Sequence, residues 1–167
     1  MTDAVETYMK QWHKERPGLN TDPMSVIARM SRAGKLITTS IRDNFQGVDI
    51  EPWEFDVLAT LLRVGAPHTL TPKKLAATSM VGGAAMTHRI DKLVQRGLVT
   101  REVDATNRRQ LLVSLTAEGI QLVDSLILDH IENSERFLQY LDADERSSLN
   151  AILRKLLLAH GDTPAQS

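Results

Sequence analysis

Side chains that could bind nucleic acid are concentrated in one quarter of this 167-residue chain. Residues 71–110 hold eight Lys and Arg against three Asp and Glu, a net charge of +5, whereas the rest of the chain carries −6. Cationic side chains bind phosphates by displacing counterions, and polar side chains beside them can read base edges. The pattern predicts a local DNA-binding surface, and the alternative interpretation is a basic helix face that only meets solvent.

Covalent and metal chemistry have little support in the sequence. There is no Cys, which excludes disulfides, thiolate metal sites and thiol-based redox sensing. The five His are scattered and none has the i, i+4 spacing of a helical metal site. Neither a Gly-rich phosphate loop nor a Ser/His/Asp elbow nor a paired-carboxylate site is present. We therefore expect no enzymatic activity, no cofactor and no metal site.

Two short helices are predicted to position the basic residues. Thr71-Pro72 is a helix start, with a capping hydroxyl followed by Pro at the first helical position, and residues 73–78 form the helix. A turn over 78–83 leads to a second helix over 84–96, and Gly97 suits the left-handed position that ends a helix. This is the outline of a helix-turn-helix, a motif that places its second helix in the major groove of DNA.

Two strands are predicted to follow the second helix. Residues 98–103 and 110–115 are rich in β-forming residues, and the second run alternates apolar with polar positions. The loop over 104–109 carries two Arg. The fold class is therefore mainly α-helical with a small β-wing, a winged helix-turn-helix.

The predicted DNA contacts are polar residues on the outward face of the second helix, residues of the wing, and residues that precede the helix. In this order they are Thr87, His88, Lys92, Gln95, Arg108, Arg109, Lys73 and Gly83. Met86, Ile90, Leu93 and Val94 are expected to face inward. The helix would read base edges or phosphates, and one wing arginine would reach the adjacent minor groove.

Helices with one apolar face are predicted on both sides of the basic stretch. We expect a single domain over 1–167, in which the winged helix-turn-helix spans 52–115. Residues 1–20 hold an extra N-terminal helix, and the dimerisation helices lie in 21–50 and 117–161. The reason to expect a homodimer is an apolar seam from Ile120 to Leu141, which is longer than a small domain needs for its own core.

Local signals mark where several of these helices begin. Asp22-Pro23 has an Asp that could serve as N-cap before a Pro, and Glu51-Pro52 has a similar pattern. Thr116 precedes the first C-terminal helix, and Asp142 with Glu145 forms a capping box before the last one. These signals fix the helix starts independently of any partner.

The N-terminal segment MTDAVETYMK is too polar for a signal peptide. No apolar run approaches the roughly 18 residues of a membrane span. We therefore expect a cytoplasmic protein with no membrane partner.

Three motifs together resemble the multiple-antibiotic-resistance regulator (MarR) family of transcription factors. They are AAMTHRIDKLVQRGLVTR at 84–101, the D-x-x-N-R-R wing at 104–109 and LLVSLTAEG at 111–119. The resemblance covers essentially the whole chain. It implies a homodimer that binds a pseudo-palindromic double-stranded DNA operator, with half-sites about one helical turn apart. It also implies a repressor that a small molecule releases from DNA.

Other features resemble the urate-responsive branch of that family, in which a Trp, an Asp and two Arg are linked to urate or related purines. Matching the motifs places these residues at Trp12, Asp56, Arg89 and Arg101. An Arg fork suits a planar anion, a Trp offers a stacking surface, and a carboxylate near an anion can act as a repulsive switch. The implied effector is urate or another small anionic purine.

Each ligand residue has a plainer alternative. Trp12 could only pack its helix against the protein, and Asp56 could balance Arg63 or Lys35. Arg89 and Arg101 could bind phosphate. Other functions also stay open: a phenolic compound or a metal could be the effector, or the dimer could be a constitutive DNA-binding or architectural protein.

Three departures from the family pattern carry expectations of their own. Gly82-Gly83 replaces the usual hydroxyl residues before the second helix, which predicts weaker capping. His88 stands where the branch usually has Asn, which predicts a different base preference. Asn107 replaces an Asp, so an anchoring ion pair would be missing and the wing would be looser.

Overall fold

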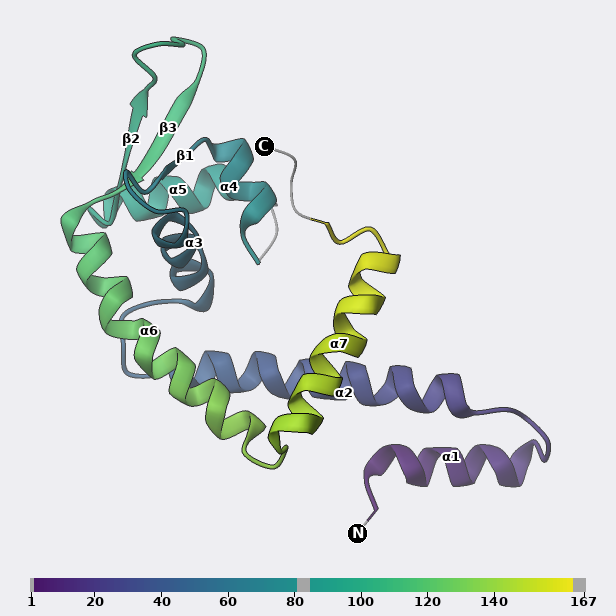
Figure 1. The fold of residues 1–167 in the computed structure, drawn as a ribbon. Coiled ribbons are helices and arrows are strands. Elements are labelled where there is room, and N and C mark those ends of the chain that lie inside the picture. The colour runs from purple at the N-terminus through teal and green to yellow at the C-terminus, as the bar shows by residue number, and fades with distance from the viewer. Residues whose placement is uncertain (1, 81–84, 164–167) are drawn as a thin grey trace. The chain divides into compact units, whose positions relative to one another are not determined.

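The structure is a computed structural model and describes residues 2–80 and 85–163. The chain divides into two compact units, Met1–Asp43 and Asn44–Ser167 (Figure 1). Each unit has its own internal packing. None of the described helices has the length and apolarity that crossing a bilayer requires.

The first unit consists of α1 (Ala4–Glu15) and most of α2 (Asp22–Asn44). The Asp3 carboxylate caps α1 by accepting a hydrogen bond of 2.8 Å from the Glu6 N–H, and it also pairs with Arg29 of α2 at 2.7 Å. These contacts lower the pKa of Asp3, with the hydrogen bond from Arg29 as the largest cause. A single carboxylate therefore both starts α1 and ties it to α2.

The predicted start of α2 is wrong by one position. Asp22 is the first residue of the helix rather than its N-cap, because the Thr21 carbonyl accepts the first helical hydrogen bond, from the Ser25 N–H. Thr21 is buried, whereas no side chain of α2 is buried in the single chain. Ile27, for example, is 64% exposed.

The second unit begins with α3 (Pro52–Arg63), β1 (Thr69–Leu70), α4 (Pro72–Thr78) and α5 (Met86–Gln95). It continues with β2 (Val99–Val103), β3 (Leu111–Leu115), α6 (Ala117–Leu138) and α7 (Ala143–Ala159). The predicted fold class, mainly α-helical with a small β-wing, is confirmed. The β2–β3 hairpin extends from the end of the unit that holds α4 and α5 (Figure 1).

The three strands form an antiparallel sheet in the order β1-β3-β2. Two of them were predicted, and β1 was not, because a two-residue strand has no periodicity of its own. Thr69 pairs with Ser114 of β3, and their hydroxyl oxygens are 2.7 Å apart. Tertiary contact therefore creates β1.

The core of this unit lies where α3, α4, α5, α6 and the sheet meet. Its fully buried side chains come from every one of these elements, and they are Val57, Leu58, Thr60, Leu61, Leu75, Ile90, Leu93, Val99, Val113 and Val123. Burial of apolar surface at about 25 cal/mol per Å² stabilises this unit. The core holds α5 against β2 and α4 and thereby sets which face of α5 is exposed.

The predicted starts of α3, α4, α6 and α7 are confirmed. Thr71 and Thr116 cap α4 and α6 by accepting hydrogen bonds from backbone N–H groups at 3.1 and 3.0 Å. Capping boxes begin α3 at Glu51 and α7 at Asp142. Local side-chain chemistry fixes these starts, which is why sequence alone could locate them.

Gly119 permits a close backbone contact at the start of α6. A Cβ at this position would lie 2.1 Å from the Leu98 carbonyl oxygen, so no other residue fits without movement of the backbone. Thr116 binds the same segment, which leads into β2. Its hydroxyl donates a hydrogen bond to the Gly97 carbonyl at 2.8 Å, and its backbone N–H donates one to the Leu98 carbonyl at 3.2 Å. The start of α6 is thus hydrogen-bonded to Gly97 and Leu98, which follow α5.

The apolar seam predicted up to Leu141 ends earlier. α6 ends at Leu138, and Leu141 lies in the turn that leads to α7. Arg146 stabilises this turn, because its guanidinium donates to the Leu138 and Leu141 carbonyls at 2.9 and 3.1 Å and pairs with Glu135 at 2.6 Å. The Arg146 side chain of α7 thus binds carbonyl groups at the end of α6 and in the turn, and connects the two helices.

Candidate functional site

The exposed face of α5 carries the predicted recognition residues. Met86, Ile90 and Leu93 are buried on one side of the helix. The predicted contact residues are exposed: His88, Lys92 and Gln95 lie on the opposite side, and Thr87 lies at its edge. The division follows from helical periodicity, since 3.6 residues per turn put these two sets on different faces.

Two details of this helix differ from prediction. Val94 was expected to face inward but is 37% exposed, because its position lies beside the Ile90–Leu93 face rather than on it. α5 begins at Met86 rather than at residue 84, and Ala85 precedes it with a left-handed φ of 62° and no side-chain cap. Gly82, Gly83 and Ala84 lie outside the described residues, so the expectations for them are untested.

The wing loop is held by hydrogen bonds around Asp104. Its carboxylate accepts from the Thr106 N–H and hydroxyl, both at 2.7 Å, and from the Asn107 N–H at 3.3 Å. These donors lower the pKa of Asp104, the Thr106 hydroxyl most. The Asn107 side chain in turn accepts from the Arg109 N–H at 3.2 Å. Hydrogen bonds to the ionised Asp104 carboxylate, together with one to the Asn107 side chain, thus shape the loop, and the looser wing stays a prediction.

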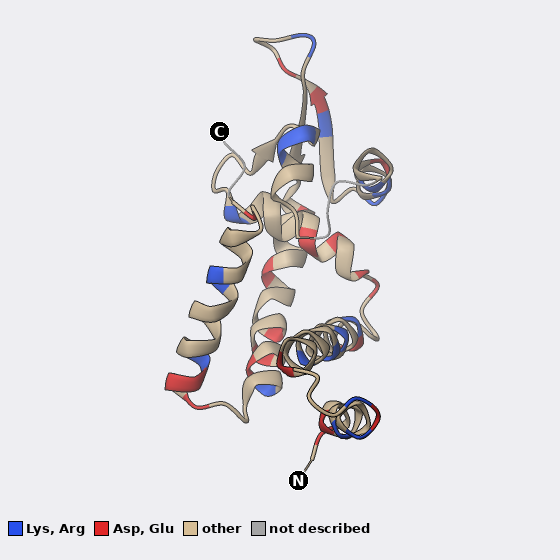
Figure 2. Cartoon of the chain, turned by 90° about the vertical axis from the view of Figure 1, so that its right-hand side faces the viewer, with Lys and Arg blue, Asp and Glu red and all other residues tan. Residues whose placement is uncertain are grey.

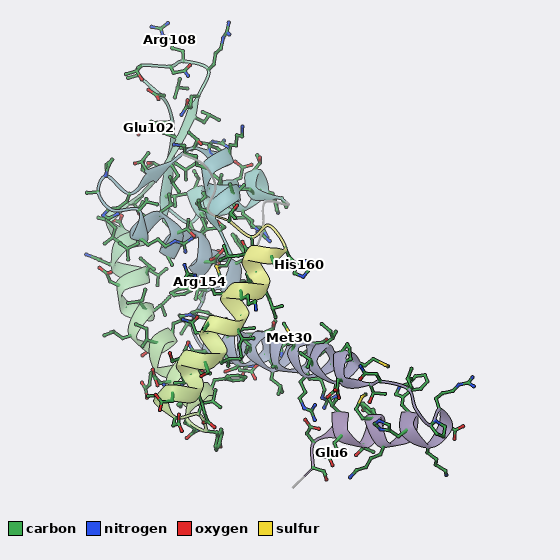
Figure 3. All side chains as sticks on the ribbon, turned by 45° about the vertical axis from the view of Figure 1, so that its right-hand side comes forward. Glu6, Met30, Glu102, Arg108, Arg154 and His160 are labelled. Atoms are coloured by element: carbon green, nitrogen blue, oxygen red, sulfur yellow. The ribbon has the colours of Figure 1, made fainter. Side chains whose placement is uncertain are left out.

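Positive charge lies in the wing loop and in the groove between the wing and α4. Arg108 and Arg109 are exposed in the loop; Figure 2 shows Lys and Arg positions in blue at the hairpin tip, and Figure 3 shows the Arg108 side chain there. A groove of about 880 Å³ lies between α4 and residues 107–111. All of its charged lining residues are cations, namely Lys73, Lys74 and Arg109. Such a groove attracts phosphate.

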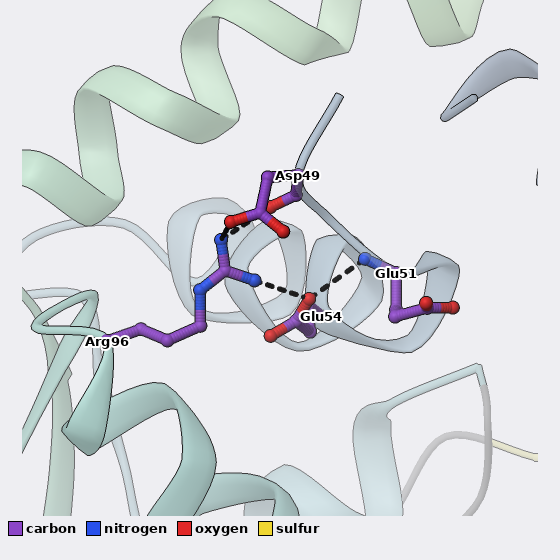
Figure 4. Close-up of polar contacts among 4 residues, drawn as sticks. All are labelled: Asp49, Glu51, Glu54 and Arg96. Atoms are coloured by element: carbon purple, nitrogen blue, oxygen red, sulfur yellow. Dashed lines mark hydrogen bonds and ion pairs between the residues drawn. The ribbon is translucent and has the colours of Figure 1, made fainter. Parts of the chain in front are cut away.

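Arg96, at the C-terminal end of α5, fixes the orientation of the helix (Figure 4). Its guanidinium pairs with the buried Glu54 carboxylate at 2.8 Å, and with the exposed Asp49 carboxylate at 3.2 Å. It also donates to the Asp49 carbonyl. Glu54 accepts in addition from the Glu51 N–H at 2.8 Å, so the capping box of α3 is part of the same cluster. We call these four residues the Arg96 clamp.

The four residues matched to a ligand site fall into three places. Trp12 lies on α1 in the first unit and is 43% exposed. Asp56 lies on α3 and accepts a hydrogen bond of 3.2 Å from the Met80 N–H. The Arg89 guanidinium lies over the Trp53 ring, 5.8 Å from its centroid. Arg101, on β2, pairs with Asp91 at 2.5 Å.

The contacts of Arg89 and Arg101 therefore lie on different flanks of α5. Arg89 reaches α3, whereas Asp91, the partner of Arg101, is two residues further along α5 and hence about 200° around the helix. Asp56 lies on the same side of α3 as Trp53, because the two are three residues apart. The structure thus associates Asp56 with Arg89 through α3, and it gives Arg101 an acidic partner of its own.

Two functional candidates were missed from sequence. Trp53 stands in the PWEFDVLATL motif, three residues before Asp56, but only tertiary packing places it against Arg89. The pairing of Arg96 with Glu54 joins residues 42 positions apart. No local pattern predicts such a pair. Metal ligands do not gather in the described part of the chain.

A helix-turn-helix with a β-wing, a polar outward helix face and a cationic wing tip defines a winged helix-turn-helix DNA-binding protein. The MarR family model matches residues 48–110. The HTH-type transcriptional regulator PecS of Dickeya dadantii (strain 3937) is 34% identical over 152 residues, which are 91% of this chain and 92% of PecS. The chain belongs to the MarR family of transcriptional regulators, and it is not an enzyme.

Solved structures show the same fold. Sco3205 of Streptomyces coelicolor, in complex with DNA, has a TM-score of 0.76 at 20% identity over 88% of this chain and 95% of its own. A mutant of MarR from E. coli, complexed with operator DNA, has a TM-score of 0.72 at 24% identity over 83% and 98%. BpsR of Bordetella bronchiseptica, whose DNA binding is regulated by 6-hydroxynicotinic acid, has a TM-score of 0.71 at 21% identity over 84% and 96%.

Proposed function

We propose that this protein is a homodimeric repressor that releases a pseudo-palindromic operator when a small planar anion, urate or a related purine, binds beside α5. The observation that carries the proposal is the division of α5 between two kinds of contact. One side presents the polar residues Thr87, His88, Lys92 and Gln95, and another side sends Arg89 to α3. A single helix can thereby bind DNA and respond to a ligand.

The proposal of a homodimer rests on apolar surface that the single chain leaves uncovered. α2 and α7 have no buried side chain, and Leu128 and Ile131 of α6 are 70% and 53% exposed. Contiguous apolar helix faces of this kind are characteristic of protein interfaces. Two-fold symmetry would then place the two winged units on half-sites about one helical turn apart.

The DNA contacts that we propose combine α5, the wing and α4. The α5 face would lie in the major groove, Arg108 and Arg109 would follow the wing to the minor groove or backbone, and Lys73 would meet phosphate at the α4 groove. Gly83 remains a proposed contact from the sequence. His88, which replaces Asn, would read a base edge with one of its ring nitrogens.

Arg108→Ala is expected to weaken operator binding about tenfold, since a charge-assisted hydrogen bond is lost. It should also reduce the slope of log K against log salt by about 1. Fluorescence anisotropy at several salt concentrations measures both. Arg136→Ala is the control, because Arg136 lies on α6 and is 55% exposed. An unchanged slope in Arg108→Ala would remove Arg108 from the DNA interface.

The proposed ligand site is centred on Asp56 and Arg89. A guanidinium offers a planar fork of donors that suits a planar anion. The Asp56 carboxylate accepts a hydrogen bond from the Met80 N–H, which lies in the turn between α4 and α5. An anion beside Arg89 would repel that carboxylate and weaken its hold on the turn. A coupling of roughly 1–3 kcal/mol between ligand and DNA is the expected size.

Trp12 and Arg101 are proposed as further ligand contacts on the strength of the family resemblance. To bind an anion, Arg101 has to break its ion pair with Asp91 and form one with the ligand. Because both partners are partly exposed, that pair is weak and can be exchanged. The regulation of BpsR by 6-hydroxynicotinic acid, another planar nitrogen heterocycle, supports an effector of this chemical class.

The test is release of an operator obtained by selecting bound duplexes from a random DNA library. The compounds are urate, xanthine, hypoxanthine, a guanine nucleotide, 6-hydroxynicotinate and, for the phenolic alternative, salicylate. We expect a purine anion to weaken operator binding by about 5- to 150-fold. Asp56→Asn should bind the operator normally and respond less.

Two results would contradict the proposal. If no compound changes operator affinity, the protein is a constitutive DNA-binding protein. If Asp56→Asn loses DNA binding but keeps normal ligand affinity, Asp56 is a structural residue and not the switch.

A further inference from the structure

An acidic residue lies among the proposed DNA contacts of α5. Asp91 comes three residues after His88 and four before Gln95, so it is a neighbour of both on the outward side of the helix. Its side chain is 41% exposed. With this side of α5 in the major groove, which is about 12 Å wide, the carboxylate faces phosphates at both edges of the groove. Salt screens such a repulsion only in part, because the Debye length is about 8 Å at physiological ionic strength.

Arg101 provides a positive charge beside this carboxylate. The Arg101 Nη1 atom lies 2.5 Å from Oδ1 of Asp91. Arg101 stands two residues after Val99 on β2, and because side chains alternate along a strand, both lie on the same face of the sheet. Val99 is buried in the core, where β2 packs against α5, whereas the Arg101 side chain lies further along the wing and is 37% exposed. The packing of α5 on β2 thus brings the cation to the acid.

This ion pair is expected to matter for DNA binding and not for folding. Both side chains are partly exposed, and pairs of this kind contribute little to stability, because solvent screens them and ordering two side chains costs entropy. Next to a polyanion their charges count for more. Together Asp91 and Arg101 present no net charge to DNA, whereas Asp91 without Arg101 presents a negative one.

We propose that Arg101 is a positioning residue of the DNA-binding face, which neutralises Asp91 and holds its carboxylate toward β2. This inference rests on the proposed docking of α5 in the major groove and does not depend on the effector. It differs from a direct contact of Arg101 with phosphate, since a direct contact contributes whether or not residue 91 is charged. It also differs from base reading by Asp91, in which the carboxylate would accept a hydrogen bond from a cytosine amino group.

The experiment measures affinity for the selected operator by fluorescence anisotropy, without any effector. Arg101→Gln is expected to weaken binding about tenfold, because it leaves a carboxylate uncompensated beside DNA. Asp91→Asn should bind at least as tightly as the wild type, and Asp91→Asn/Arg101→Gln should return to within about threefold of it. Arg101→Lys, which keeps the charge, should also stay within about threefold.

The matched control is the double variant Arg101→Gln/Glu102→Gln. It has the same net charge as Asp91→Asn/Arg101→Gln, but Glu102 lies on the opposite face of β2 from Arg101. We expect the control to bind about as weakly as Arg101→Gln alone. Equal recovery in both double variants would show that the total charge of the wing matters and would overturn the inference.

Three further results would also overturn it and leave the proposed function standing. The first is a loss in Arg101→Gln that persists in the Asp91→Asn background, as a direct phosphate contact requires. The second is weaker binding by Asp91→Asn, as base reading requires. The third is an Arg101→Gln variant that fails to fold, which circular dichroism would show. A wild-type protein for which no operator can be selected overturns the proposed function and this inference together.

Discussion

Replacing Leu153 and Leu156 of α7 by Arg is expected to give a monomer that no longer holds its operator. Both residues are 36% exposed, and they belong to an apolar face with Leu149, Ile152 and Leu157. Burying two unpaired charges in an apolar interface has a desolvation free energy that is unfavourable and that no new contact compensates. A monomer also loses the benefit of binding two half-sites at once, about 10²- to 10⁴-fold in affinity.

Light scattering gives the oligomeric state, and anisotropy with the selected operator gives the affinity. Ser147→Arg is the control, because it adds a charge to the same helix at a position about opposite the apolar face. Circular dichroism should show the helical content of the wild type in all variants. A double variant that stays dimeric would place the dimer interface elsewhere than on α7.

Arg96→Gln is expected to lower the free energy of unfolding by about 1–3 kcal/mol, because it leaves a buried carboxylate without its charged partner. The side chain of Glu54 is 5% exposed and that of Arg96 is 30% exposed, so solvent compensates part of the loss. The variant should also bind operator less tightly, since α5 loses an anchor at its C-terminal end.

The control for this prediction lies within the Arg96 clamp. The Asp49 carboxylate pairs with the same guanidinium but is fully exposed, so Asp49→Asn should change stability little. Urea denaturation at one fixed protein concentration compares the variants, because the stability of a dimer depends on concentration. If Asp49→Asn destabilises the protein as much as Arg96→Gln, burial of Glu54 is not what makes the clamp important.

The winged unit could be predicted from sequence because its signals are local. Thr71 and Thr116 cap their helices within three residues, and the alternation of β3 is visible in a run of six. The basic charge of 71–110 added the expectation of DNA binding. What could not be predicted depends on tertiary contact: β1 exists by pairing with β3, and the Arg96 clamp joins distant residues.

The residues assigned to the effector site also depend on tertiary contacts that the sequence does not reveal. The family resemblance implied Trp12, Asp56, Arg89 and Arg101 as a set, but it gave no distances between them. The structure associates Arg89 with Trp53 and Arg101 with Asp91, on different flanks of α5. An ion pair and a cation–π contact depend on how α3, α5 and β2 pack, and no periodicity in the sequence encodes that packing.

The close approach of Gly119 to Leu98 couples the position of α6 to that of α5. Two hydrogen bonds from Thr116 and the close approach of Gly119 to Leu98 hold the start of this helix against the segment that follows α5, so we expect a tilt of α5 to move α6 as well. A helix of 22 residues is about 33 Å long. A tilt of about 5° at its fastened end therefore displaces its other end by about 3 Å. We expect a displacement of this size to change the packing of side chains at the start of α7.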